Sequence, residues 1–363
     1  MLKTSASFRL IIGFVGIIAA ASVGSGPAQA YKIAPSDRIH ESITMLAEQC
    51  VIEAAPREPS DCRRFAGEIA SLIAPRRRAT FSDLQLTVRW PDDPARQLVT
   101  TGLLSFGGNM LGNCKRRMLR NPNETLDTVG ILCTSHFGRF QFFHAMASAR
   151  GERTEDTRAK ILNWADLTFR LGTNRTRANS LICDYFKTGH QEIASAFQLT
   201  HSRHCARDED PWTLATIFNW RCGGITMGRC EQMLRPATSE TLAARVARGA
   251  LLHMIQDSYS ESHADRGAPR PFRSRVSCRL PVAFHNFLGQ RGHGAADHVP
   301  VFDKSCSSDP RPDNPRADDT RADDVITASA MTIYHLQNRT DPPLYSEYLQ
   351  KHVFGRLVPA AQR

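Results

Sequence analysis

The fold is decided by residues 239–263, which read SETLAARVARGALLHMIQDSYSESH. Their apolar side chains recur at helical spacing, and successive residues of a helix are rotated by about 100°. Val246, His253 and Asp257 therefore lie on one narrow stripe, which should face the core of the protein. Ionisable side chains at buried positions are rare unless they are paired or bind a ligand. The stretch predicts a buried helix over 239–258 that carries a histidine and an aspartate into the interior.

Helical spacing also dominates the remainder of the sequence. The further predicted helices cover residues 39–50, with Ser36 or Asp37 as the cap, and residues 137–149, 159–171, 180–199 and 326–337. Only two short segments, 84–90 and 97–104, have the character of strands. The polar, proline-containing residues 307–324 predict an exposed loop. Because the sequence shows neither an internal repeat nor an interdomain linker, we expect one mainly α domain with long loops over residues 31–363.

The N-terminus has the pattern of a signal peptide. Lys3 and Arg9 precede the apolar run 10–23, and Ala28-Gln29-Ala30 matches the small-residue pattern of a cleavage site. We predict cleavage after Ala30, which would remove residues 1–30 and place the protein outside the cell or in the periplasm. The alternative is an uncleaved membrane anchor, for which the apolar run is short.

The ten cysteines fit an oxidising compartment. An even number of scattered cysteines favours disulfide bonds, and the lack of any C-x-x-C pair argues against a thiolate zinc site. We expect sequence neighbours to pair. The predicted bonds are Cys50–Cys62, Cys114–Cys133, Cys183–Cys205, Cys222–Cys230 and Cys278–Cys306.

Composition and charge narrow the classes of function. The sequence has 41% hydrophobic and 23% charged residues, the balance of a globular protein, which excludes a disordered or collagen-like chain. Its 46 Lys and Arg against 36 Asp and Glu give +10, and loss of Lys3 and Arg9 would leave +8. A basic surface suits an anionic phosphodiester or lipid partner, although plain solubility explains the charge equally well. We expect no nucleotide cofactor, because no Walker loop occurs, and the lack of G-x-S-x-G argues against a serine hydrolase.

Histidine and aspartate form a recurrent pattern along the chain. The set comprises the i, i+4 pairs His253–Asp257 and His293–Asp297, His263 six residues after Asp257, His40 on the first predicted helix, and His144 in an apolar segment. Neutral imidazoles combined with carboxylates suit zinc or a similar divalent ion. The alternative for each pair is a buried, hydrogen-bonded His–Asp couple, and for each lone histidine an ordinary core or surface position.

The spacing H-x3-D-x5-H at His253, Asp257 and His263, followed by H-x3-D at His293 and Asp297, resembles the zinc-dependent phospholipase C and single-strand nuclease superfamily. Members of this superfamily are mostly helical and hold three zinc ions in a cleft. The match is strongest over residues 253–297. The superfamily's usual Gly-Asp and His-Gln-Pro neighbours are replaced here by the sequence QDSYS at 256–260, which indicates a divergent member.

The resemblance implies ligands for up to three zinc ions. Tyr31 and His40 match the mature N-terminal residue and an early histidine, although the superfamily usually has Trp at the first position. The sequence WPDDP at 90–94 resembles the nuclease branch's Trp-Ala-Asp stretch, or is a Pro-Asp turn. His144 is the best match for the remaining histidine, and Asp127, Asp166 and His136 are substitutes. The implied sites are Asp92 or Asp93 with His144, His253 and Asp257; His263 with His293 and Asp297; and Tyr31 with His40, with Asp257 bridging.

By the same resemblance, the protein would hydrolyse a phosphodiester with a metal-activated water. Asp92 or Asp93 would take the proton of that water, and a cation such as Arg266 would stabilise the leaving oxygen. We expect a phospholipase C-like enzyme that contacts a membrane surface, because segment 257–263 lacks the nuclease neighbours. One alternative is a single-strand nuclease, favoured by the basic charge and by Asp297. The other is a secreted metal-binding or interaction protein without turnover.

Overall fold

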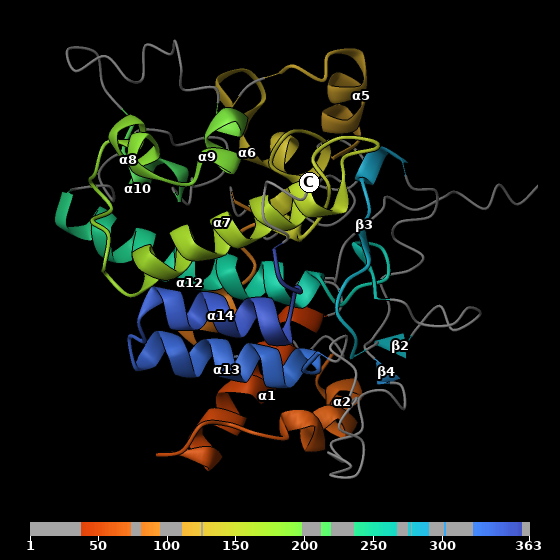
Figure 1. Ribbon diagram of the computed structural model, residues 1–363, viewed down its shortest axis with the longest axis vertical. Helices are drawn as coiled ribbons and strands as arrows, with labels where there is room; N and C mark the ends of the chain where they lie inside the picture. Colours follow the sequence, from red (N-terminus) through yellow and green to blue (C-terminus); the bar gives the residue numbers. More distant parts are fainter. Residues whose placement is uncertain are drawn as a thin grey trace, which may run out of the picture.

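The computed structural model describes residues 38–73, 81–94, 111–124, 126–197, 212–218, 236–266, 275–276, 278–289, 301–302 and 322–357. These residues form a mainly helical domain, as the periodicity predicts (Figure 1). The α-helices are α1 (Ile39–Ala54), α2 (Ile69–Ile73), α3 (Asp83–Thr87), α5 (Gly112–Arg120), α6 (Leu126–Phe137), α7 (Thr154–Gly172), α8 (Ile182–Thr188), α9 (Gln191–Ala194), α10 (Leu214–Ile217), α12 (Pro236–Asp257), α13 (Val325–Gln337) and α14 (Pro342–His352).

Short 3-10 helices and strands complete the described part of the chain. The 3-10 helices are η1 (Cys62–Glu68), η3 (Gln141–His144), η4 (Ser195–Phe197) and η7 (Phe287–Gly289). The strands are β1 (Ala264–Asp265), β2 (Arg275–Val276), β3 (Ala283–Phe284) and β4 (Val301–Phe302). β1 pairs antiparallel with β3, and β2 pairs parallel with β4.

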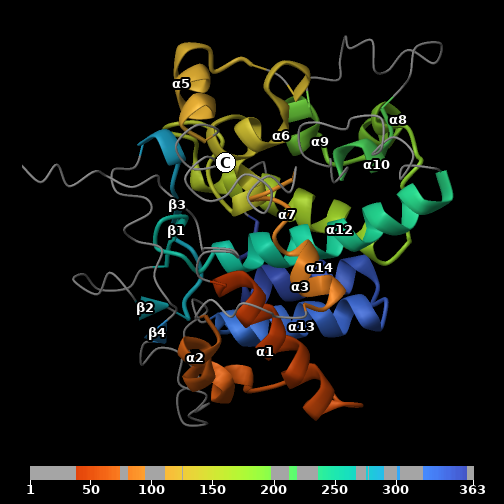
Figure 2. The ribbon, with the colours of Figure 1, turned by 180° about the vertical axis from the view of Figure 1, so that it is seen from behind.

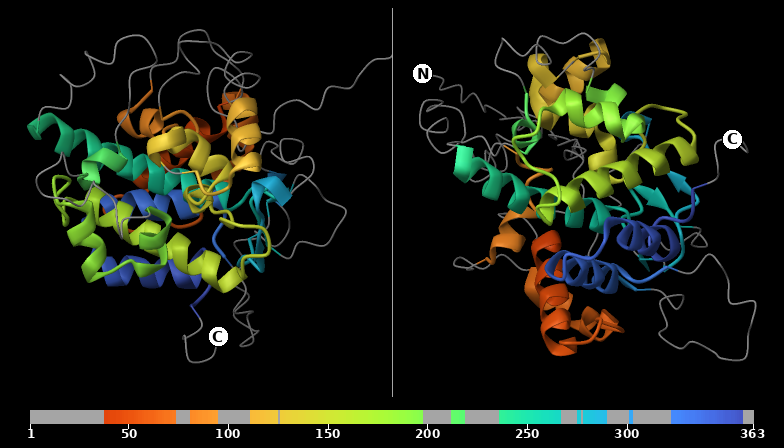
Figure 3. Two further views of the ribbon diagram at one scale, coloured as in Figure 1. Left: turned by 90° about the horizontal axis from the view of Figure 1, so that it is seen from above. Right: turned by 60° about the vertical axis from the view of Figure 1, so that its left-hand side comes forward.

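Helix α12 lies at the centre of the domain. All residues from Gly249 to Ser260 are buried, so the C-terminal half of this helix has no solvent face. α7 and α13 pack against it, α14 packs against α7, and α1 packs mainly against α13 (Figures 1 and 3). Figure 2 shows α3 on the opposite side of the molecule, where it packs against α12. The predicted helix over 239–258 is confirmed, and it begins three residues earlier.

A glycine allows α3 to approach α12 closely. A Cβ atom at Gly249 would lie 2.2 Å from the carbonyl carbon of Thr87 and 2.6 Å from the amide nitrogen of Val88. A side chain at this position is therefore incompatible with the observed packing. The close approach places the end of α3 beside the next turn of α12, which carries His253.

Two disulfide bonds between described residues are those predicted. Cys50–Cys62 joins α1 to η1, and Cys114–Cys133 joins α5 to α6. Cys183 and Cys278 are disulfide-bonded as well. Their predicted partners Cys205 and Cys306, and the predicted pair Cys222–Cys230, lie outside the described residues.

Several predicted elements differ from the structure. Residues 84–90 do not form a strand, because Ser82 and Gln85 make a capping box that starts α3. Residues 137–149 do not form one helix: α6 ends at Phe137, Gly138 follows, and η3 ends where Ala145 adopts a left-handed conformation. Residues 180–199 are divided into α8, α9 and η4 by Gly189 and by His190, whose φ is 59°. Segment 97–104 lies outside the described residues.

The remaining boundaries show smaller differences. Arg38 rather than Ser36 or Asp37 is the N-cap of α1. The predicted loop 307–324 lies outside the described residues except for its last three. Of these three, Ala322 and Asp324 are buried, which differs from the predicted exposure. The Asp324 carboxylate accepts hydrogen bonds from the first turn of α13 and so caps that helix. Residues 1–37, including the predicted signal peptide and Tyr31, are also outside the described part. None of the described helices is both long and apolar enough to cross a membrane.

Candidate metal centre

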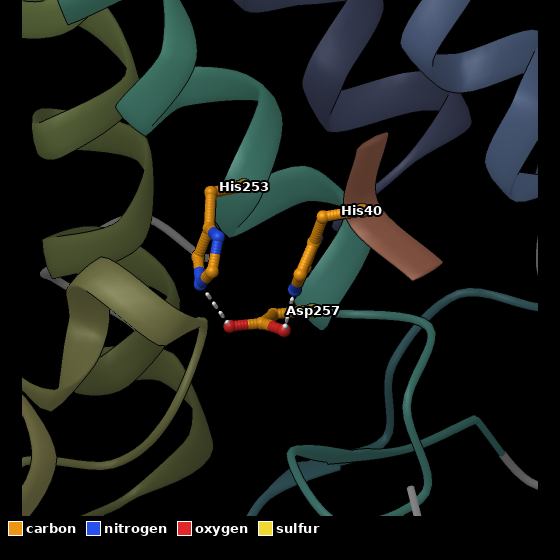
Figure 4. A group of neighbouring side chains, drawn as sticks. All are labelled: His40, His253 and Asp257. Carbon is orange, nitrogen blue, oxygen red and sulfur yellow. Dashed lines mark ion pairs between the residues drawn. The ribbon is translucent and has the colours of Figure 1, made fainter. Parts of the chain in front are cut away.

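The carboxylate of Asp257 lies at the centre of a buried group of imidazoles. One oxygen, Oδ1, is 3.3 Å from His40 Nε2, and the other, Oδ2, is 3.0 Å from His253 Nε2 (Figure 4). Oδ2 is also 2.8 Å from His144 Nδ1 and 3.6 Å from His263 Nδ1. The two carboxylate oxygens therefore face different histidines.

These side chains come from elements that are far apart in the sequence. His253 and Asp257 are one turn apart on α12, as their i, i+4 spacing predicts. His40 is the second residue of α1, and its ring stacks on that of His253 with 4.0 Å between centroids. His263 approaches because α12 ends at Asp257 and the chain turns back. All four side chains are at most 1% exposed.

The group contains a second carboxylate, that of Asp92, which lies in the segment after α3. Its Oδ1 atom is 3.5 Å from His136 Nε2, 3.7 Å from His253 Nε2 and 3.9 Å from His144 Nδ1. The Asp92 side chain is 13% exposed, whereas the side chains of His144, His253 and Asp257 are at most 2% exposed. Asp92 is therefore the more accessible of the two carboxylates.

Aromatic packing fixes the segments that carry Asp92 and His144. Trp90, two residues before Asp92, is fully buried and lies 6.1 Å from the ring of Phe143. Phe143 directly precedes His144 and stacks on Trp164 of α7 at 3.9 Å. Because both segments are anchored on the same aromatic cluster, their side chains are held in a fixed relation to each other. Phe137, Phe140, Phe142 and Phe143 are all core residues.

Hydrogen bonds at Nδ1 orient four of the imidazoles. In each of them Nδ1 lies against a neutral acceptor oxygen of the protein. In His40, His136 and His253 the Nε2 atom faces a carboxylate of the group, an arrangement that is typical of metal-ligating histidines. The acceptors are Val88 O for His253 (2.8 Å), Leu132 O for His136 (2.9 Å), His144 O for His263, and Gln256 Oε1 for His40 (2.7 Å). Since these acceptors need a donor, each Nδ1 carries the proton and each Nε2 is free of it in the neutral ring.

The electrostatic environment keeps both carboxylates ionised. Burial raises the pKa of Asp92, but His253, His136 and His144 outweigh burial and lower the pKa to about 2. Burial acts in the same direction on Asp257, and His253 and His263 bring its pKa well below the ordinary value. Ionised carboxylates are the form that binds a metal ion.

The histidines fall into two kinds. Burial, together with the nearby His136, lowers the pKa of His144 to about 3, and burial lowers the pKa of His263 as well. His40 is different: burial lowers its pKa, but the adjacent Asp257 outweighs burial and raises the pKa to about 9. His144 and His263 are thus neutral at physiological pH, while His40 must lose a proton to bind a metal.

Two overlapping groups of side chains could hold a metal ion: His40, His253 and Asp257, and Asp92, His144 and His253. Within each group, one ligand atom per side chain lies within 4.8 Å of the others. One buried atom of the cluster, His144 Nε2, has no hydrogen-bond partner among the described residues, and Asp257 Oδ1 has only the long 3.3 Å contact with His40 Nε2. Buried polar atoms normally have a partner, so the free His144 Nε2 is consistent with a ligand that would complete the group.

The structure brings together six of the predicted ligands, namely His40, Asp92, His144, His253, Asp257 and His263. Among the described contacts, Asp92 rather than Asp93 faces the histidines, and Asp93 is buried nearby. His136, predicted as a substitute, joins the group through Asp92 and lies beside His144. Tyr31, His293 and Asp297 lie outside the described residues, and so does the side chain of Asp127.

Two other predicted residues have different surroundings. Asp166 lies on α7, where its Oδ2 is 2.7 Å from both Arg170 Nε and His190 Nε2. Burial raises the pKa of Asp166, but the hydrogen bonds from His190 and Arg170 lower it overall. Arg266 is 4% exposed and donates to the carbonyl oxygens of Ser258 and Arg279. The predicted role of Arg266 at a leaving oxygen is therefore not supported, because these carbonyls hold its guanidinium.

Gln256 is a site residue that the sequence does not reveal. Its Oε1 accepts from His40 Nδ1 at 2.7 Å, and its Nε2 donates to Thr44 Oγ1 at 3.0 Å. The only signal in the sequence is its place directly before Asp257, which on a helix does not share the face of Asp257.

No protein-family model, curated protein or solved structure matches this chain. The site is therefore argued from the chain's own residues.

Proposed function

We propose that this protein is an exported, zinc-dependent phosphoester hydrolase with phospholipase C-like activity. The observation that carries the proposal is the Asp257 carboxylate, whose two oxygens face different imidazoles. A carboxylate placed in this way can bridge two metal ions, and paired metal ions are typical of enzymes that hydrolyse phosphoesters. The resemblance at His253, Asp257 and His263 supports the same reaction class.

The ligand set supports zinc as the metal. Imidazole nitrogens with one or two carboxylates are the usual zinc ligands of hydrolytic enzymes, whereas magnesium and calcium prefer oxygen ligands alone. His40, His253 and Asp257 would hold one ion, and Asp92 and His144 with shared His253 or Asp257 would hold a second. His263 would contribute to a third ion with His293 and Asp297.

A bound zinc pair would lower the pKa of a water molecule and neutralise charge on the phosphoryl group. The protein supplies the remaining requirements. Asp92 is the partly exposed carboxylate, so it is the residue that can accept a proton from an entering water. Val88 and Gln256 hold the rings of His253 and His40 so that each Nε2 faces Asp257. The aromatic cluster around Trp90 and Phe143 fixes the positions of Asp92 and His144 relative to each other.

The test combines metal analysis with hydrolysis of bis-p-nitrophenyl phosphate. We expect the purified protein to contain zinc, to lose activity with a chelator and to regain it with zinc. His253→Ala and Asp257→Asn should each reduce zinc content and abolish activity, because each removes a shared ligand. His335→Ala is the matched control, since His335 is also buried but bonds to Thr340 instead.

The outcomes separate the competing functions. Full zinc content and activity in both ligand variants would refute the site. Zinc binding without hydrolysis would support the non-catalytic metal-binding alternative. Hydrolysis of single-stranded oligonucleotides in preference to phosphatidylcholine would support the nuclease alternative and refute the phospholipase C-like one.

A further inference from the structure

Helix α5 presents an exposed cationic face around a leucine. On a helix, Lys115, Leu119, Arg116 and Arg120 follow one another at about 40–60° intervals, so they share one side. All four side chains are exposed, and Leu119 is 57% exposed. We call these four residues the α5 face. The α5 face thus combines three cations with one exposed leucine.

The opposite side of α5 is anchored firmly. Cys114 is bonded to Cys133 of α6, and Met118 is fully buried in a small core with Phe137 and other residues. The buried positions 114 and 118 are one turn apart, as expected for one face of a helix. The disulfide and the core therefore fix the direction in which the α5 face points. Figures 1 and 2 show α5 at the end of the molecule opposite α1 and α2.

The positive charge of the α5 face is not neutralised within the described part of the chain. Arg117, beside the face, pairs with Glu124 at 2.9 Å. Lys115, Arg116 and Arg120 form no ion pair with a described carboxylate; Arg116 donates to the neutral Asn113, and Arg120 donates to a backbone carbonyl. Three cations on little more than one turn create a strong local attraction for an anionic partner.

We propose that the α5 face docks the protein on an anionic phospholipid surface. Clusters of cations are attracted to anionic lipid headgroups, and a leucine exposed among them can enter the headgroup region while the cations meet the phosphates. A single-stranded nucleic acid site would also need aromatic side chains on which bases stack. α5, with the sequence GNCKRRMLR, contains none.

The α5 face is linked to the candidate metal centre through α6. Cys133 of α6 forms the disulfide bond with Cys114 of α5. His136, three residues after Cys133 on α6, contacts Asp92, the more accessible carboxylate of the centre. Docking through α5 would bring the domain that carries the metal centre to a lipid surface. This inference rests on the proposed phospholipase C-like function and specifies its substrate as lipid in an anionic membrane.

The test is cosedimentation of the purified chain with vesicles of phosphatidylcholine, either alone or mixed with phosphatidylglycerol. We expect binding to the anionic vesicles, weakened by salt. Each cation near an anionic leaflet contributes about fivefold in binding, so the triple variant Lys115→Gln, Arg116→Gln, Arg120→Gln should bind about 100-fold more weakly. Leu119→Ser should weaken binding without changing its salt dependence.

A matched triple variant, Arg57→Gln, Lys351→Gln, Arg356→Gln, removes the same charge from exposed positions outside α5 that form no ion pair with a described carboxylate. It should bind within about threefold of the wild type, because exposed charges are screened beyond about 10 Å. Equal vesicle binding by the two triple variants would overturn the proposal. Binding of a single-stranded oligonucleotide that depends on the α5 face, with no vesicle binding, would overturn it as well.

Hydrolysis of soluble bis-p-nitrophenyl phosphate separates this inference from the proposed function. We expect the α5 triple variant to retain the wild-type rate on this substrate, because none of its three residues belongs to the metal centre. Zinc-dependent hydrolysis without α5-dependent vesicle binding would overturn the docking surface and leave the proposed function intact. Vesicle binding through α5 without any hydrolysis would support the surface and refute the hydrolase.

Discussion

Replacing Gly249 with alanine should move α3 away from α12 and disturb the metal centre. The added Cβ would lie 2.2 Å from the carbonyl carbon of Thr87, whereas ordinary contacts begin at 3.4 Å. The backbone at the end of α3 must therefore retreat by roughly 1 Å, the difference of these distances, because close-packed backbone atoms cannot overlap. The neighbouring Val88 carbonyl, 2.8 Å from His253 Nδ1, would move with it.

The size of the effect follows from this displacement. Overpacking of a core costs about 1–3 kcal/mol, and the better helix propensity of alanine offsets up to about 1 kcal/mol. We expect a net loss of about 1–2 kcal/mol in the free energy of unfolding. The hydrogen bond between His253 and Val88 would stretch beyond about 3.5 Å and be lost. Losing such support for a zinc ligand weakens zinc affinity by about 10–100-fold.

Urea unfolding of the metal-free protein measures the stability change, and competition with a chromophoric chelator measures zinc affinity. Gly67→Ala is the matched control, since a Cβ at Gly67 meets nothing within 4 Å. It should leave both quantities unchanged or slightly raise stability. If Gly249→Ala matched Gly67→Ala in both measurements, the role assigned to the close approach of α3 and α12 would be refuted.

Three further predictions concern other contacts. Gln256→Leu should lower zinc affinity about 10–100-fold, because it removes the acceptor of His40 Nδ1, whereas Gln256→Glu keeps an acceptor and should retain most of the affinity. Equal zinc affinity of the wild type and both variants would contradict the role of Gln256. Asp166→Asn should destabilise the protein at pH 6 but progressively less below about pH 4. A carboxyl whose pKa is lowered by folding contributes its full stability above its unfolded pKa and loses it as the pH falls toward its folded pKa; a pH-independent difference in urea unfolding would exclude this. Cys114→Ser with Cys133→Ser should cost about 3 kcal/mol, as expected for a loop of 19 residues, and an unchanged urea midpoint would show that α5 is held without the disulfide.

The long helices could be predicted from the sequence because their periodicity spans several turns. α7, α12 and α13 lie within a few residues of the predicted bounds, with α7 starting five residues early. The secondary structure of short segments is harder to predict, since a few alternating residues fit a strand or a helix equally well. Within 84–90 the Ser82 cap and the packing against α12 favour a helix over a strand. The packing against α12 is a contact between distant segments, so the local sequence does not show it.

The sequence by itself determined the mainly helical fold and the place of His253 and Asp257 on one buried face, because helical spacing fixes which side chains share a face. Two disulfide bonds followed the pairing of sequence neighbours, and the resemblance implied that His40, His144 and His263 join the group. Only the tertiary structure decided that Asp92 rather than Asp93 faces the histidines, that His136 joins the group, and that Gln256 orients His40 from a position 216 residues away along the chain. Such contacts depend on how helices approach one another, as at Gly249, and packing between distant segments leaves no periodic signal in the local sequence.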